Sequence, residues 1–132
     1  MAYIAYLSVD GETFRIEGTS HCNDRAIERD YFDSDFVVGR LETLFGREDF
    51  VDAILNGIRM GDKFIIRDEI IGMDIAVDYA YDKFDAMDVL TAITTRCKLR
   101  VGNGQKVLRV LKDKVCLGVW NNATKRLEVS EW

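Results

Sequence analysis

The side chains best suited to metal chemistry are five aspartates that recur every three or four positions between residues 73 and 88. They are Asp74, Asp78, Asp82, Asp85 and Asp88. Mg²⁺ and Ca²⁺ prefer clustered oxygen ligands, which carboxylates supply. In an extended strand, however, Asp74 and Asp78 are about 13 Å apart, which is too far for both to bind one ion. We therefore predict that this segment holds no metal site and no cofactor.

Other side chains capable of chemistry do not form a recognisable site. His21 adjoins Cys22, but adjacent residues seldom reach the hydrogen-bond geometry of a thiol–imidazole pair. Cys97 and Cys116 lack the paired C-x-x-C spacing of a zinc site. The turn-like segment 102–104 lacks the length and the hydroxyl residue of a phosphate-binding loop. The sequence thus predicts a protein that is not an enzyme.

Length and composition favour one domain spanning residues 1–132. With 48% hydrophobic and 31% charged residues, the chain is large enough for one core and too small for two. Its three cysteines, an odd number, favour free thiols in a reducing compartment. The N-terminal residues lack a basic start and a long apolar run, so they resemble neither a secretory signal nor a membrane span. We expect a cytoplasmic protein without a membrane segment.

Charge is divided unevenly along the chain, although its net value is only −5. Residues 1–95 hold 20 of the 23 acids and 9 of the 18 basic residues, whereas residues 96–132 hold 3 acids and 9 basic residues. Nine of the acids lie between residues 24 and 52, with four arginines. This division predicts an acidic surface and a basic surface on one small protein.

The N-terminal half predicts a hairpin followed by helices. Residues from Ala2 to Val9 alternate in polarity, Asp10–Gly11 suits a tight turn, and Thr13 to Glu17 returns as a second strand. A helix is predicted from about Asp24 to Phe32. Helical spacing of apolar residues then resumes between residues 36 and 57, with an interruption at Gly46.

Two periodicities compete in the aspartate-rich segment. As a strand, Met73 to Tyr81 would place apolar residues on one face and Asp74, Asp78 and Asp82 in water. As a helix, the same segment would bury a stripe that includes Met73 and Phe84. We favour the strand because aspartates four residues apart repel each other on a helix. Lys63 to Ile71 predicts a preceding strand, and residues 85–97 predict a helix that begins at Asp85.

The C-terminal region predicts a meander of up to four short strands, over residues 98–101, 106–111, 115–120 and 126–130. The segment 106–112 also fits one or two helical turns. Taken together, these elements predict an α+β fold. Its mostly antiparallel sheet would comprise the N-terminal hairpin, the central strand and the C-terminal meander, packed with about three to four helices.

The acidic side of the molecule is the favoured functional surface. We expect it to bind a basic surface on another protein, as inhibitors of the immunity or phage anti-defence type do, because charge complementarity speeds association and suppresses wrong partners. The acidic candidates are Asp68, Glu69, Asp74, Asp78 and Asp82, with Tyr79, Tyr81 and Phe84 as aromatic anchors if their rings are exposed. Asp74→Lys combined with Asp78→Lys is expected to leave folding intact.

Two alternative functions remain open. Basic residues between positions 96 and 112 could contact the phosphates of a nucleic acid: Arg96, Lys98, Arg100, Lys106, Arg109 and Lys112. The tryptophans lie outside this basic segment of the sequence, so base stacking has little support there. The second alternative is a homo-oligomer in which the acidic part of one copy meets the basic part of the next.

Overall fold

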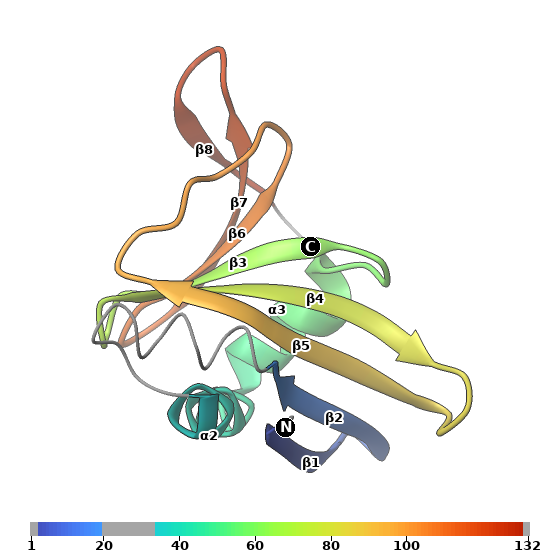
Figure 1. Ribbon diagram of the computed structural model, residues 1–132. Coiled ribbons are helices and arrows are strands. Elements are labelled where there is room, and N and C mark those ends of the chain that lie inside the picture. Colours follow the sequence, from blue (N-terminus) through green and yellow to red (C-terminus); the bar gives the residue numbers. More distant parts are fainter. Residues whose placement is uncertain (1–2, 20–33, 131–132) are drawn as a thin grey trace.

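The computed structural model describes residues 3–19 and 34–130, which form one eight-stranded mixed sheet and two helices (Figure 1). The spatial order of the strands is β1-β2-β5-β4-β3-β6-β7-β8. Neighbouring strands are antiparallel except for the pairs β2–β5 and β3–β6, which are parallel. The elements are β1 Tyr3–Val9, β2 Glu12–Gly18, α2 Ser34–Leu44, α3 Glu48–Gly57, β3 Lys63–Asp68, β4 Met73–Asp82, β5 Met87–Arg96, β6 Lys106–Val110, β7 Val115–Asn121 and β8 Arg126–Val129.

The predicted N-terminal hairpin is confirmed. β1 and β2 pair along their full lengths, from Tyr3 opposite Gly18 to Val9 opposite Glu12. The two-residue turn between them needs positive φ angles, and Asp10 and Gly11 adopt φ values of 49° and 81°. Aspartate and glycine tolerate this backbone region better than other residues do, which is why the sequence reveals the turn.

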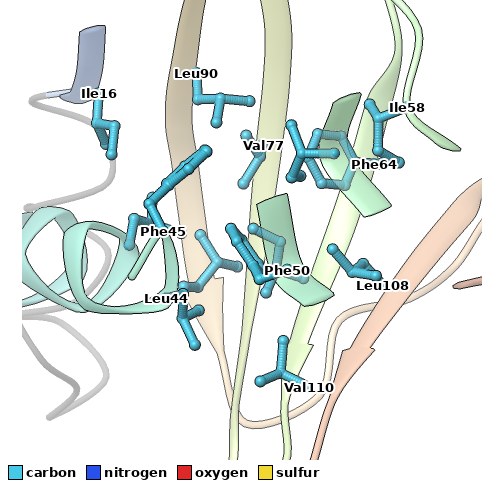
Figure 2. Packing of buried hydrophobic residues seen from close by; sticks show 14 of the residues in the cluster. Ile16, Leu44, Phe45, Phe50, Ile58, Phe64, Val77, Leu90, Leu108 and Val110 are labelled. Atoms are coloured by element: carbon cyan, nitrogen blue, oxygen red, sulfur yellow. The ribbon is translucent and has the colours of Figure 1, made fainter. Parts of the chain in front are cut away.

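The helices α2 and α3 pack on one face of the sheet, and the predicted helical region from 36 to 57 is confirmed. Figure 2 shows Leu44, Phe45 and Phe50 on the face of the sheet that carries Val77 and Leu90, and all five belong to the same buried cluster. Burying a side chain of this size contributes about 2–3 kcal/mol to folding. The helix predicted from Asp24 to Phe32 lies outside the described residues.

The predicted fold class is wrong, because the described residues form a fold made mostly of strands: one mixed sheet of eight strands with two helices, rather than an antiparallel sheet packed with three to four helices. The largest error is the helix predicted over 85–97, because most of this segment forms β5, an interior strand of the sheet. Its apolar residues fit helical spacing, but the segment also carries the β-branched residues Val89, Thr91 and Ile93. β5 pairs with β2 on one side and β4 on the other, and this pairing decides its conformation.

The segment predicted as a strand over 98–101 is instead part of the connection from β5 to β6. This connection must pass β4 and β3, because those strands lie between β5 and β6 in the sheet. Its backbone contacts Asp74, which points away from the helices since its neighbours Met73 and Ile75 belong to the core. The connection therefore crosses the face that α2 and α3 do not cover.

The other predicted strands are confirmed. Met73–Asp82 is a strand, as its alternating pattern indicated, and β3 covers most of the predicted segment from Lys63. The last three strands of the meander are also present, so the helical alternative for residues 106–112 is wrong.

Candidate protein-binding surface

Two of the five predicted acidic contact residues are buried. Asp68 lies on the helix-covered side, where its Oδ2 accepts a hydrogen bond of 2.6 Å from Arg40 Nε. Asp74, which the alternation predicted to face water, is only 1% exposed. Its two carboxylate oxygens accept hydrogen bonds of 3.1 Å each from Nε and Nη2 of Arg67, and a third of 2.9 Å from Leu99 N. Both carboxylates hold elements of this fold together.

The other three acidic candidates lie nearer the surface. Glu69 is exposed and pairs with Arg109 at 2.7 Å, although surface pairs of this kind contribute little to stability. Asp78 is half-buried, and no ion pair joins it to another described residue. Asp82 pairs with Arg15 at 2.7 Å and begins the turn between β4 and β5. These three candidates are scattered over the sheet rather than gathered in one patch.

Arg15 organises the end of the sheet where β4 turns into β5. Its Nη2 donates to Asp82 at 2.7 Å and its Nη1 donates to Asp85 at 2.9 Å. Its Nε lies 2.7 Å from Glu17 Oε1, close enough for an ion pair but without good hydrogen-bond direction. The hydrogen bond with Asp82 is the main reason that the pKa of Arg15 is raised and the pKa of Asp82 is lowered. Arg15, a residue of β2, therefore holds the β4–β5 turn in place through these hydrogen bonds.

The turn itself is further ordered by Asp82. Its Oδ1 accepts hydrogen bonds from the backbone amides of Phe84 at 2.9 Å and Asp85 at 3.3 Å. Ala86 completes the turn with a φ of 52°. Aspartate commonly satisfies backbone amides two or three residues ahead in this way. We refer to residues 81–86, which end this hairpin, as the β4–β5 tip.

The three aromatic candidates are placed differently. Tyr79 is 4% exposed and its hydroxyl donates to Asp88 Oδ2 at 2.8 Å. Burial and this hydrogen bond raise the pKa of Tyr79. Tyr81 and Phe84, in contrast, are 49% and 90% exposed. The ammonium group of Lys83 lies 5.8 Å from the centre of the Phe84 ring.

The β4–β5 tip borders a depression of about 370 Å³. Arg15 and Val89 contribute to its lining, together with Tyr81, Asp82 and Phe84 of the tip. The structure therefore brings together one acidic and two aromatic candidates from the sequence. Arg15 was not singled out by the sequence, because nothing in β2 signals its contact with a residue 67 positions away.

A larger hollow of about 700 Å³ lies between the β1–β2 turn and α3. Asp10, Glu48 and Asp52 line it, so it belongs to the acidic side predicted from residues 24–52. Asp49 also lines it, but Arg47 binds this carboxylate at 3.0 and 2.8 Å and lowers its pKa. Asp10 was not expected here, because its position in a hairpin turn gives no indication of the helix opposite.

The basic candidates do not form one continuous patch. Lys106 pairs with Asp62 at 2.6 Å and Arg109 pairs with Glu69. Four others are exposed and form no ion pair with any described residue: Arg96, Lys98, Arg100 and Lys112. Lys98 and Arg100 line a hollow of about 430 Å³ together with Trp120 and Lys125, two residues that the sequence did not place beside them.

The described residues contain neither a metal-binding cluster nor a membrane-spanning helix. No group of three or more His, Cys, Asp or Glu side chains in residues 3–19 and 34–130 is arranged to hold a metal ion. In the same part of the chain, no helix has the length and apolar character needed to span a membrane. Comparisons with known protein families, curated proteins and solved structures find no match to this chain.

Proposed function

We propose that this protein is a non-enzymatic binding protein of the cytoplasm whose β4–β5 tip contacts a partner protein. The observation that carries the proposal is the 90% exposure of Phe84 at the end of the hairpin. A large aromatic ring gains free energy when it leaves water, and such rings are enriched among the residues that dominate binding energy. Tyr81, the other exposed aromatic of the tip, extends this apolar contact area.

The ordering of the tip favours binding. Arg15 and Asp82 hold the turn in one conformation through the hydrogen bonds described above. A segment that is ordered before it binds loses less conformational entropy in the complex. Figure 1 shows that β4 and β5 project together past β3, which leaves the tip accessible to a large partner.

The charge around the tip favours a partner with a basic surface. Phe14 of β2 pairs with Asp88 of β5, so the β1–β2 turn lies at the same end of the sheet as the tip. This end carries the exposed carboxylates Asp10, Glu12 and Asp85. The partner would therefore present basic residues around an apolar pocket that accepts Phe84. By analogy with small acidic inhibitors of the immunity or phage anti-defence type, inhibition is the form of binding that we propose.

The proposal is tested with a pair of matched variants. Phe84→Ser removes the exposed ring of the tip. Val129→Ser is the control, because it removes a side chain that is 81% exposed on the edge strand β8, away from the tip. A partner is first captured from lysate treated with nuclease and is then purified. Removing a dominant contact residue weakens binding by roughly 30-fold or more, so we expect this loss for Phe84→Ser and unchanged affinity for Val129→Ser.

The charge contribution is tested separately through the association rate. Glu12→Lys reverses an exposed charge at the same end of the sheet and leaves the hydrogen bonds from Arg15 to the tip in place. This variant is expected to slow association with the basic partner, and added salt is expected to reduce the difference from the wild type. Equal affinity of the wild type and Phe84→Ser for every captured partner would contradict the proposed role of the tip.

A further inference from the structure

The hollow beside Trp120 combines an aromatic side chain with several basic side chains. Its lining includes the basic residues Lys98, Arg100 and Lys125, the indole of Trp120, and no carboxylate. We infer that this basic pocket binds a nucleotide unit, with the base against Trp120 and the phosphate among the three basic side chains. Its volume of about 430 Å³ falls in the range of small-molecule sites.

The basic pocket is assembled from two segments that are distant in the sequence. Lys98 and Arg100 come from the β5–β6 connection, whereas Trp120 and Lys125 come from the β7–β8 hairpin. The two segments are joined by hydrogen bonds, including 3.0 Å from Trp120 N to Gln105 O and 2.8 Å from Gly104 N to Trp120 O. A further bond of 3.0 Å runs from Asn122 N to Asn103 Oδ1.

One residue that lines the basic pocket belongs to the ion pair between Arg67 and Asp74. Arg67 lines the pocket, and its guanidinium is bound to both oxygens of Asp74. The same carboxylate accepts a hydrogen bond from the backbone of Leu99, between Lys98 and Arg100. Asp74 therefore fixes the part of the connection that supplies two of the basic side chains.

The three outer cations are available to a ligand. Lys98, Arg100 and Lys125 are exposed, and none of them forms an ion pair with a described residue. Arg67 is different, because Asp74 already neutralises it. Three positive charges that form no ion pair within residues 3–19 and 34–130 surround one hollow and attract phosphate groups, even in a protein whose net charge is −5.

Trp120 makes a nucleotide a better ligand than a simple anion. Its indole Nε1 donates to Asn122 Oδ1 at 2.7 Å, a bond in the plane of the ring that fixes the ring's orientation. A fixed aromatic face among basic residues is the arrangement on which bases stack in proteins that bind single strands. A polyglutamate chain would pair with the charges but has no aromatic base to stack on the indole.

The inference is tested through the fluorescence of Trp120. The chain has two tryptophans, so Trp132→Phe leaves Trp120 as the only one. This variant is titrated at low salt with a short oligo(dT), a short oligo(U), ATP and, as an anion without bases, polyglutamate. We expect the nucleotide ligands to quench Trp120. Preference for the oligonucleotides would identify a single strand as the ligand, and equal affinity for ATP would identify a free nucleotide.

Further variants test the basic side chains and the aromatic side chain of the basic pocket separately. Arg100→Glu with Lys125→Glu should abolish binding. Arg59→Glu with Lys114→Glu, which reverses two exposed charges outside the pocket lining, should leave it unchanged. Loss of base stacking lowers affinity by roughly 5- to 150-fold, so a Trp120→Leu variant, assayed with a fluorescent oligonucleotide, should show a loss in this range. Three phosphate contacts predict a roughly 20-fold loss of oligonucleotide affinity between about 50 and 200 mM salt.

Three results would overturn the inference. The first is the absence of binding by oligo(dT), oligo(U) and ATP at low salt. The second is quenching by polyglutamate equal to that by the nucleotides. The third is unchanged affinity of the Arg100→Glu, Lys125→Glu variant or of Trp120→Leu. None of these results bears on Phe84, because the β4–β5 tip and the basic pocket have no lining residue in common.

Discussion

Replacing Asp74 with asparagine tests the structural role of the aspartate-rich segment most sharply. The side chain keeps its size, but the negative charge that pairs with Arg67 is lost. Asp74 is 1% exposed and receives three hydrogen bonds, two from Arg67 and one from Leu99. Its backbone carbonyl also accepts a bond of 3.1 Å from the hydroxyl of Thr95, which the substitution leaves in place.

The expected cost follows from what remains after the substitution. Removing one member of a buried ion pair costs about 3–5 kcal/mol, because the other charge stays behind without its partner. The side chain of Arg67 is 20% exposed and so regains some hydration, and asparagine can still accept the bond from Leu99. We therefore expect Asp74→Asn to lower the free energy of unfolding by about 2–3 kcal/mol, a large share of the roughly 5–15 kcal/mol of a typical domain.

Asp74→Lys should lower the free energy of unfolding far more than Asp74→Asn does, because it would place a second cation against Arg67. The sequence suggested that Asp74→Lys with Asp78→Lys leaves folding intact, and the structure reverses this expectation for Asp74. Asp78 is half-buried and has no ion pair with a described residue, so Asp78→Lys alone should fold. Asp78→Asn is the matched control for Asp74→Asn.

The assay is equilibrium unfolding in urea, followed by far-ultraviolet circular dichroism, of the wild type, Asp74→Asn and Asp78→Asn. We expect a clear fall of the midpoint for Asp74→Asn and a shift within about 0.5 kcal/mol for Asp78→Asn. Combining Asp74→Asn with Arg67→Met should show a coupling of about 1–3 kcal/mol in a double-mutant cycle. Equal midpoints for the two asparagine variants would refute our assignment of Asp74 as a buried anchor.

Two further predictions concern ion pairs. Arg40→Met leaves the fully buried carboxylate of Asp68 without its cation and should cost about 3 kcal/mol or more in the same assay; an unchanged midpoint would contradict the contact. Asp82 has a pKa held below its ordinary value of 3.8, mainly by the hydrogen bond from Arg15, so this bond stabilises the folded protein above that pH and is lost as the pH falls below it. The melting temperatures of the wild type and Arg15→Met should therefore differ at neutral pH and converge in acid, whereas a constant difference would count against the bond.

The elements that the sequence predicted correctly carry strong local signals. Asp10–Gly11 specifies a tight turn whatever the rest of the chain does, and the alternation from Met73 to Asp82 is difficult to satisfy with a helix. β5 carries no such signal. Its apolar residues fit both periods, and pairing with β4 and β2 determines its conformation. β2 is distant in the sequence, since Phe14 pairs with Asp88.

The sequence also predicts the candidate sites only in part, because contacts between distant segments complete them. Alternation places Asp74 on the face opposite the core but does not reveal that the β5–β6 connection covers it. Likewise, Trp120 lies outside the basic segment in the sequence, and only the pairing of β6 with β7 brings it beside Arg100. The sequence left open whether the Phe84 ring is exposed, and it did not reveal that Arg15 orders the turn in which Phe84 lies.

Photocrosslinking in the source cells tests the central proposal most directly. A photoreactive phenylalanine analogue is introduced in place of Phe84, and in a second protein in place of Val129, which is nearly as exposed. We predict that the analogue at position 84 crosslinks to one basic protein and that the analogue at position 129 does not. Absence of any crosslink from position 84, or the same products from both positions, would contradict a partner bound at the β4–β5 tip.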